Sequence, residues 1–428
     1  MKHEKPINPN YCAIVTIIDK LHDIDNCDNV IHAEIFGNLI IVTKNTKLND
    51  IGIFFPVECK LSHEFLKQNN LYRHSEQNID NTKVGYFEDN GRIRCMKFRG
   101  NRSEGLFMPL DCLTFTNIDT SKLQEKDCFD VLNGSSICTK YEIVTKECTS
   151  NNPIKRNTCK MFIEHFDTKH FMRELNSLPS NTLCYIEEKI HGTSHRTGYM
   201  KYDSVFKPTF LQKIRAIFKP DVKNNYIHLN GTRRVIHDPN KTYNSFHDNT
   251  MREEVLEKVS GKLNKGEQLY MELFGYEKNG KHIQKGFPYN CKPNDTTSYR
   301  TLLYRVTMNN EDGERVDYNR EYVYNKAKLL GLEVPHLFEK YYYDGSEQSL
   351  EILKEKVQTY AHGQSESGTD TLKEGVVIWF IDVKGEWKAL KHKSPEFILR
   401  ETQQLDELNK KNDKRTNRTI SGRHGKNE

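Results

Sequence analysis

The chain has 428 residues, enough for two domains of ordinary size. Hydrophobic residues make up 36% and charged residues 29%, so a packed core can form beneath a heavily charged surface, and the formal net charge of +5 does not by itself indicate a nucleic-acid partner. The eleven cysteines form no Cys-x-x-Cys pair, and no apolar stretch is long enough for a membrane helix or a signal-peptide core. We therefore expect a soluble, intracellular protein with reduced thiols and no membrane partner.

Residues 1–148 are expected to form a small β domain. Short runs rich in Val, Ile and Phe, separated by turn residues, predict strands at residues 12–18, 39–43, 52–61 and 91–98. Several short strands at this spacing are typical of a small barrel or sandwich. In the last run the apolar alternation breaks at Cys95 and Met96, which predicts a bulge or a strand end there.

A polar linker at 149–158 precedes a larger α+β domain at 159–405. Helical spacing covers residues 161–178, and further helices are predicted at 251–263, 319–330 and 349–360 between strands that begin near residue 183. We expect a flexible loop at 363–370 ahead of a strand at 374–381. The polar, basic residues 406–428 are expected to form a flexible tail.

The stretch CYIEEKIHGTSHR at 184–196 carries the first candidate for chemistry. A strand leads to Lys189, and the chain then turns at His191 and Gly192, where a glycine permits close backbone approach to a ligand. Taken alone, this short pattern is also compatible with a surface turn that carries a solvated lysine.

Two further strands carry charged residues that suit a nucleotide. Lys391 and Lys393 lie two apart in ALKHKSPEF, so both ammonium groups point to one side, where they suit a phosphate. A solvated basic face is the alternative. Glu374 stands at the head of the apolar strand in KEGVVIWF, where a carboxylate can hold Mg²⁺.

Three other segments complete the candidate site. Glu272 lies inside the apolar run LYMELFGY, where a charge is costly unless it faces a cleft or a partner. Tyr304 in YRTLLYRVT is a candidate platform for adenine, although a core aromatic is as compatible with the residue type. In NGTRRVIHD only one of Arg233 and Arg234 can face a given side of a strand, and that one is expected to meet phosphate.

These residues, in this order, resemble the covalent nucleotidyltransferase superfamily, and most closely the ATP-dependent RNA ligases of the phage RNA-ligase-2 type. The resemblance implies that Lys189 is the nucleotidyl acceptor and that Glu374 holds the metal. It implies Arg234 for contact with the RNA end, with Arg233 as the second choice. The chain departs from the family's pattern at Ser194, where an asparagine is usual, and at Trp379 and Phe380, where a lysine often follows. The nucleotide-binding residues implied are Glu188, His191, Gly192, Glu272, Tyr304, Lys391 and Lys393.

The N-terminal part adds a second resemblance. Residues 51–73 and 91–110 resemble the N-terminal OB domain of the Deinococcus- and Naegleria-type RNA ligases, which place this accessory domain ahead of the catalytic one. DNA ligases and capping enzymes place an OB domain after it, so this order favours an RNA ligase. Basic residues near Arg92, Arg94, Lys97 and Arg99 are expected to hold RNA.

The resemblance therefore implies an ATP-dependent RNA ligase that uses Mg²⁺ or Mn²⁺. It would seal 3′-OH and 5′-phosphate RNA ends through lysyl-AMP and RNA-adenylate intermediates, in RNA repair and without an obligate protein partner. A DNA ligase or a GTP-dependent capping guanylyltransferase is an alternative with the same chemistry. A non-catalytic RNA-binding protein that retains the fold is an alternative of another class.

Overall fold

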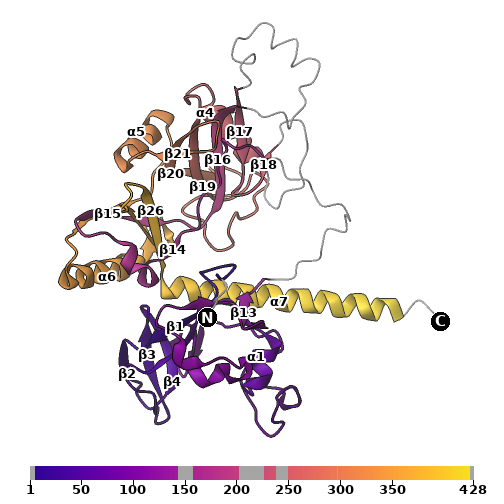
Figure 1. Ribbon diagram of the computed structural model, residues 1–428. Coiled ribbons are helices and arrows are strands. Elements are labelled where there is room, and N and C mark those ends of the chain that lie inside the picture. The colour runs from indigo at the N-terminus through magenta and orange to yellow at the C-terminus, as the bar shows by residue number, and fades with distance from the viewer. Residues whose placement is uncertain (1–4, 143–157, 202–225, 238–248, 296, 425–428) are drawn as a thin grey trace. The chain divides into compact units, whose positions relative to one another are not determined.

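The computed structural model describes residues 5–142, 158–201, 226–237, 249–295 and 297–424, with the backbone alone at 411–424 (Figure 1). The chain divides into two units, one formed by residues 1–149 together with 395–428 and the other by residues 150–394. The predicted linker at 149–158 lies almost entirely outside the described residues. The mixture of helices and antiparallel strands confirms the predicted combination of α and β structure.

Unit 1 contains two main antiparallel sheets. The first has the order β10 (Cys128–Phe129), β1 (Ala13–Ile17), β5 (Ile51–Phe55), β9 (Leu106–Pro109), and the second consists of β2 (Lys20–Asp23), β3 (Val30–Ile35) and β4 (Asn38–Thr43). Three short pairs complete the unit: β6 (Cys59–Leu61) with β13 (Cys138–Lys140), β7 (Met96–Phe98) with β8 (Asn101–Ser103), and β11 (Val131–Leu132) with β12 (Ser135–Ser136). The sheets of the described residues do not close into a barrel, so the OB-like barrel stays a prediction.

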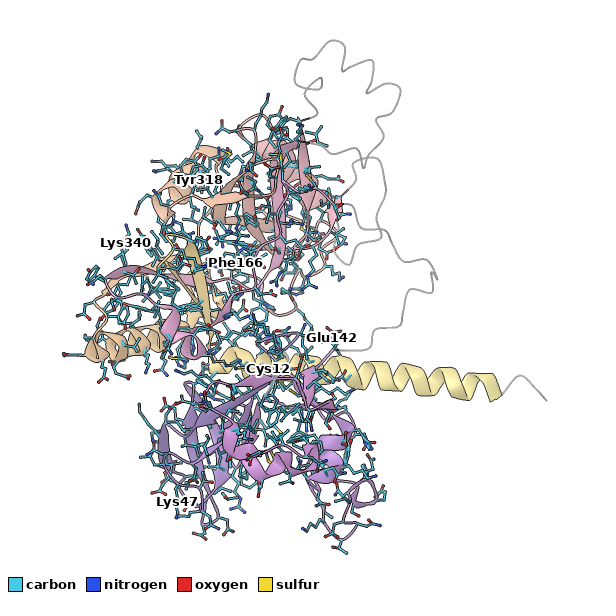
Figure 2. The ribbon with its side chains drawn as sticks, viewed as in Figure 1. Cys12, Lys47, Glu142, Phe166, Tyr318 and Lys340 are labelled. Atoms are coloured by element: carbon cyan, nitrogen blue, oxygen red, sulfur yellow. The ribbon has the colours of Figure 1, made fainter. Side chains whose placement is uncertain are left out.

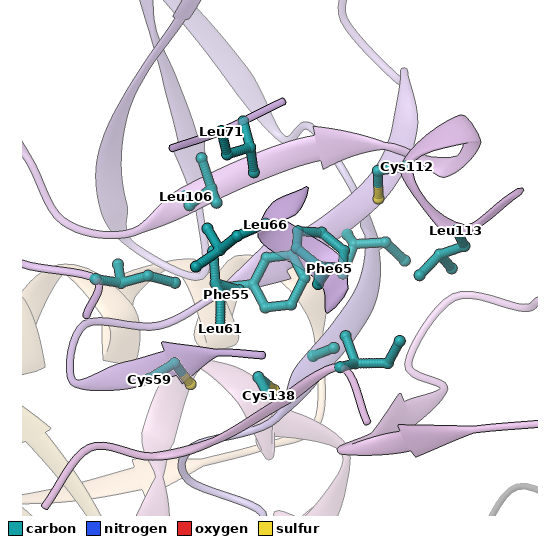
Figure 3. Close-up of a cluster of buried hydrophobic side chains, with 14 of the residues drawn as sticks. Phe55, Cys59, Leu61, Phe65, Leu66, Leu71, Leu106, Cys112, Leu113 and Cys138 are labelled. Carbon is teal, nitrogen blue, oxygen red and sulfur yellow. The ribbon is translucent and has the colours of Figure 1, made fainter. Parts of the chain in front are cut away.

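Two predicted strands of this unit are shorter than expected. The run at 52–61 is interrupted after Phe55, because Pro56 has no N–H to continue the ladder and Glu58 has a φ of 67°. The run at 91–98 is a strand only in β7, which begins at Met96, where the apolar alternation breaks. The short helix α1 (His63–Gln68) lies over the core of unit 1, with Phe65 edge to face on Phe55 at 5.3 Å between ring centroids (Figure 3).

The C-terminal helix α7 (Pro395–His424) differs from the predicted flexible tail and crosses the predicted boundary at residue 405. It is tied to unit 1 through Arg92, whose side chain is 1% exposed. The Arg92 guanidinium donates to Glu58 at 2.7 Å and to Asp406 at 2.6 Å. Arg92 is therefore a structural cation within unit 1, which removes it from the basic residues predicted to hold RNA. Within the described parts of the chain, no helix is both long and apolar enough to cross a membrane.

Unit 2 contains two larger sheets. The six-stranded antiparallel sheet has the order β18 (Ile236–His237), β17 (Tyr226–Gly231), β16 (Thr193–Lys201), β19 (Glu267–Gly275), β20 (Tyr299–Asn309), β21 (Arg315–Asp317). The five-stranded sheet has the order β14 (Lys169–His170), β26 (Trp387–Lys393), β25 (Gly375–Ile381), β15 (Thr182–Lys189), β22 (Leu337–Tyr343), and only its β14–β26 pair is parallel.

Three helices of unit 2 correspond to the predicted ones: α4 (Thr250–Val259), α5 (Arg320–Leu330) and α6 (Glu347–Ala361). The predicted helix at 161–178 is wrong. That segment contains β14 and two 3₁₀ turns, η4 (Phe171–Arg173) and η5 (Leu175–Ser177). Its backbone is bound elsewhere, because both polar groups of Ile163 bond to the side chain of Gln268. Part of the predicted loop at 363–370 is also ordered, in the pair β23 (Gln364–Ser365) and β24 (Gly368–Leu372).

A buried ion pair joins α5 to β15. Arg320, the first residue of α5, donates to Glu187 from Nε at 2.9 Å, and both side chains are 2% exposed or less. The same guanidinium donates to the Tyr304 carbonyl at 2.6 Å, and the Tyr324 hydroxyl donates to Glu187 at 2.6 Å. One arginine therefore connects a residue of each sheet.

We expect Arg320→Met to lower the free energy of unfolding by about 3–5 kcal/mol, because Glu187 would remain buried without its cation. The matched control is Lys340→Met, which breaks the more exposed pair of Lys340 with Glu321 and should change stability by less than about 1 kcal/mol. Urea unfolding of the three proteins measures both effects. Equal stability of the two variants would contradict a structural role for the buried pair.

Candidate active site

A cavity of about 220 Å³ lies between the two sheets of unit 2. Because side chains alternate along a strand, residues two apart point to the same side, and this places one row from each sheet in the cavity wall. The five-stranded sheet contributes Glu187, Lys189, Val377 and Trp379, and the six-stranded sheet contributes Ser194, Glu272, Leu302 and Tyr304. The remaining wall comes from His165, Thr168, Glu188, Ile190, Arg233 and Pro335.

Strand register brings the predicted lysines together. Lys189 on β15 pairs with Gly375 on β25, and Gly375 pairs in turn with Lys393 on β26, so the two lysines end one row across three strands. Lys391 lies two residues before Lys393 and faces the same side. A Cβ on Gly375 would lie 2.0 Å from the His392 carbonyl oxygen, so the close approach of β25 and β26 requires glycine here.

Glu374, next to this row, is the shared partner of the cations. The Lys189 Nζ donates to its carboxylate at 2.8 Å, the Lys393 Nζ lies at 3.8 Å, and the His191 Nδ1 lies at 3.7 Å. The Glu374 side chain is 3% exposed. Burial opposes its ionisation, but Lys189, His191 and Lys393 outweigh burial and hold its pKa below the usual value. The structure thus places Lys189 beside the carboxylate predicted to hold a metal.

The turn after Lys189 is held from several sides. The His191 N–H donates to the Tyr289 hydroxyl at 2.7 Å, and the Gln284 amide donates to the Gly192 carbonyl at 2.7 Å. A Cβ on Gly192 would lie 2.3 Å from the Leu273 carbonyl oxygen and 2.9 Å from Cγ of Glu272. Gly192 is therefore required by its close approach to β19, and its approach to a ligand stays a prediction.

Glu272 and Tyr304 face the cavity together from adjacent strands. Burial is the main reason that the pKa of Glu272 is raised to about 7; the charge of Lys189 opposes this rise, and the charge of Glu374 adds to it. Burial also raises the pKa of the Tyr304 hydroxyl. The Tyr304 ring meets the ring of His165 edge to face at 5.2 Å between centroids. Glu272 thus lies close enough to Lys189 and Glu374 for their charges to affect one another.

The pKa of Lys391 is strongly affected by its surroundings. Burial, followed by the charges of Lys393 and Lys189, lowers the pKa of Lys391 to about 7. A phosphate placed beside these cations would favour the protonated form of Lys391. Lys391 can therefore take up a proton when an anion binds.

Two predicted residues lie differently from the rest. Arg233 and Arg234 are both exposed, but Arg233 lines the cavity and forms an ion pair with Asp167, whereas Arg234 is absent from the wall. Glu188 contributes to the wall, but its carboxylate accepts a hydrogen bond from the Ser367 hydroxyl at 3.3 Å. Because Glu188 precedes Lys189 on a strand, its side chain points to the opposite side of the sheet.

Sequence reasoning missed His165 and Glu187. His165 lies in the segment interpreted as a helix, and no spacing pattern distinguishes it. Its ring stacks on Phe166, the residue labelled in the interior of unit 2 in Figure 2, at 4.5 Å between centroids. The guanidinium of Arg305 also lies over the Phe166 ring, 4.5 Å from its centroid. Glu187 had a signal, because it is a charge within the apolar strand TLCYIEEK.

The donor set suits a weakly protein-bound divalent cation. Among the residues that the structure describes, no three His, Cys, Asp or Glu side chains gather as metal ligands. Glu272, however, lines the cavity, and Glu374 lies close enough for the negative charges of the two carboxylates to repel each other. Mg²⁺ commonly binds one or two carboxylates and completes its shell with water and substrate phosphates. The residues present fit a cation of this kind.

The fold of the chain, with two sheets around the cavity and the Lys189–Glu374 pair, is similar to that of solved RNA ligases. Naegleria gruberi RNA ligase with pyrophosphate is similar, with a TM-score of 0.59, 17% identity, and coverage of 92% of this chain and 99% of that one. A lysine-to-methionine variant of that ligase with AMP and manganese has a TM-score of 0.58 and 15% identity, covering 91% and 98%. A lysine-to-alanine variant with ATP and manganese has a TM-score of 0.59 and 16% identity, covering 91% and 98%.

The chain therefore has the fold of an ATP-dependent RNA ligase, as the sequence resemblance predicted. No family model and no curated protein sequence matches it. At identities below 20%, the likeness concerns the fold, and the activity has to be argued from the residues of the cavity.

The state of Lys391 predicts how stability depends on pH. Its pKa is about 7 in the folded protein and 10.5 in an unperturbed lysine, so the unfolded chain binds the additional proton between these values. The free energy of unfolding should therefore rise with pH through this window, by up to about 1.4 kcal/mol per pH unit from this group. Lys391→Met should remove that rise, and the exposed control Lys384→Met should keep it. Urea unfolding from pH 7 to 9.5 measures the slopes, and identical slopes in all three proteins would contradict the assignment.

Proposed function

We propose that the protein is an ATP-dependent RNA ligase that seals 3′-OH and 5′-phosphate RNA ends in RNA repair. The observation that carries the proposal is the position of the Lys189 amine, 2.8 Å from Glu374 in a cavity shared with Glu272 and Tyr304. Solved structures of similar fold include ones with ATP or AMP together with manganese, and one with pyrophosphate. The cavity and the fold thus point to the same substrate class.

In the first proposed step, Lys189 attacks the α-phosphorus of ATP. The N–P bond forms, the bond to the β-phosphate oxygen breaks, and pyrophosphate leaves. The amine has to lose a proton, and Glu374 accepts the hydrogen bond that carries it. When ATP binds, the Lys189 amine leaves the Glu374 carboxylate and contacts the α-phosphate. The amine therefore lies close to the phosphorus before the reaction begins.

The other residues bind and neutralise the nucleotide. Tyr304 offers a ring for stacking on adenine, and Glu272 faces the same cavity for contact with the ribose. Lys391 and Lys393 lie beside Glu374, where they stabilise the negative charge of the α-phosphate. His191 and Gly192 hold the turn that follows Lys189. We assign contact with the RNA end to Arg233, because it lines the cavity and Arg234 does not.

Two further displacements complete the proposed reaction. The RNA 5′-phosphate attacks the phosphorus of lysyl-AMP, which restores the free amine and gives an adenylylated RNA end. A 3′-OH then attacks the 5′-phosphate of that end, a phosphodiester bond forms, and AMP leaves. Positioning and charge neutralisation supply most of the acceleration in such phosphoryl transfers.

Glu374 and Glu272 would hold Mg²⁺ or Mn²⁺. A divalent cation there neutralises negative charge on the phosphate oxygens. Glu374 can serve both as the proton acceptor of Lys189 and as a metal ligand, because its buried carboxylate lies next to the reacting amine.

Incubation with labelled nucleotide, followed by a denaturing gel, separates this proposal from its alternatives. Label from ATP and not from GTP argues against a capping guanylyltransferase, and sealing of nicked RNA in preference to nicked DNA argues against a DNA ligase. A protein that binds RNA and forms no adduct with either nucleotide would be the non-catalytic alternative. The presence of Lys189, Glu374, Lys391 and Lys393 in one cluster favours catalysis.

We predict that Lys189→Arg abolishes the covalent AMP adduct while the fold remains intact. Arginine keeps a cation beside Glu374 but does not form the phosphoramidate, so the variant separates the nucleophile from the structural charge. Lys189→Ala should also abolish the adduct, and the exposed control Lys384→Ala should retain it. Circular dichroism monitors folding, and an adduct in either Lys189 variant would refute the assignment.

Chelation should stop the first step. We expect EDTA to reduce adduct formation by at least about tenfold, because the triphosphate charge would lack its counterion. Addition of excess Mn²⁺ or Mg²⁺ should restore the adduct. Full adduct formation in EDTA would contradict the proposed metal requirement.

A further inference from the structure

A hairpin of unit 1 exposes apolar and basic side chains together. Strands β7 and β8 pair in the registers Met96 with Ser103 and Phe98 with Asn101. Met96 is 45% exposed and Phe98 is 47% exposed. Both belong to β7 and lie two apart, so they occupy one side of the hairpin. The turn at Arg99 and Gly100 has φ values of 49° and 86°, and a Cβ at Gly100 would have no neighbour within 4 Å.

The base of this hairpin is anchored, although its turn is exposed. The Ser103 hydroxyl accepts a hydrogen bond from the Ile41 N–H at 3.1 Å, and the Glu104 N–H donates to the Leu39 carbonyl at 2.8 Å. The His32 Nε2 lies 3.1 Å from the Arg102 carbonyl. Strands β3 and β4 thus hold β8 in place, which gives the exposed side chains of β7 a defined position.

The cations of the hairpin differ in how far they are neutralised. Arg102 forms ion pairs with Glu104 and Glu396, and Arg94 lies 3.7 Å from Asp406. In contrast, Lys97 and Arg99 form no ion pair with another residue in the described part of the chain. The guanidinium of Arg99 lies 5.6 Å from the centroid of the Phe98 ring. The turn therefore combines two uncompensated positive charges with a flat aromatic surface.

This combination suits a single strand of nucleic acid. Bases stack on exposed aromatic rings regardless of sequence, and nearby cations bind the phosphates between them. Two exposed apolar side chains are too few for a stable protein interface, which buries about 800 Å² on each partner. The charge and the ring together favour RNA over a second protein.

We propose that the β7–β8 hairpin is a stacking platform for the RNA strand, with Phe98 stacking on a base and Lys97 and Arg99 binding phosphates. This inference rests on the proposed RNA ligase function and names a second place where the substrate is held. In this proposal, Met96 forms the edge of the same stacking platform.

The test compares full-length variants in binding to a nicked RNA duplex with 3′-OH and 5′-phosphate ends, measured by fluorescence anisotropy. We expect Phe98→Ala and Phe98→Leu to weaken binding about tenfold, because the stacking surface is lost. Phe98→Trp should keep the wild-type affinity. The double variant Lys97→Ala/Arg99→Ala should reduce the slope of log Kd against log salt by about 1.5 to 2. Leu48→Ala and Lys20→Ala, exposed elsewhere in unit 1, serve as matched controls.

Lysine adenylylation separates this inference from the proposed function. All variants should form the AMP adduct at the wild-type rate, because the first step involves ATP alone. Unchanged RNA affinity of Phe98→Ala overturns the platform even if the adduct forms, as does a change in oligomeric state with RNA affinity unchanged. A wild-type protein without an adduct refutes the ligase proposal, while its RNA affinities still test the hairpin.

Discussion

The ion pair between Lys189 and Glu374 is the interaction on which the candidate site depends. An ionised carboxylate that is 3% exposed carries a desolvation penalty of several kcal/mol unless cations surround it. Lys189, Lys393 and His191 supply that compensation, Lys189 and His191 from the end of β15 and the turn after it, and Lys393 from β26. The cluster therefore exists only when β15, β25 and β26 are in their observed register. Its geometry links the position of the proposed nucleophile to the integrity of the five-stranded sheet.

Two groups near this pair have a pKa of about 7, Glu272 and Lys391. Burial shifts them in opposite directions, because it disfavours the ionised form of each. Both can therefore change charge near neutral pH when a nucleotide or a cation enters. A site with such groups adapts its charge to its ligand at little energetic cost, which suits the proposed reaction through ATP, an AMP adduct and a free lysine.

The cavity shows how far spacing along a strand can predict a site. The two-residue spacing of Lys391 and Lys393 correctly indicated a shared side, and the charge of Glu272 within an apolar run correctly indicated a cleft. The same rule applied to the Glu188–Lys189 pair would have placed Glu188 on the opposite side. His165 could not have been identified, since its segment lacks regular structure and its place at the cavity comes from contacts with Phe166 and Tyr304.

The sequence by itself determined the strands that carry Lys189, Lys391 and Lys393 and the strand that follows Glu374, because alternation and local turn residues act over a few positions. It also indicated the family resemblance that the fold bears out. Only the tertiary structure decided that Arg92 is a buried partner of Asp406 and that α7 belongs to unit 1. It also decided that Arg233 rather than Arg234 faces the cavity. These outcomes depend on which distant charges meet, and the pairing of residues 314 positions apart leaves no local pattern in the chain.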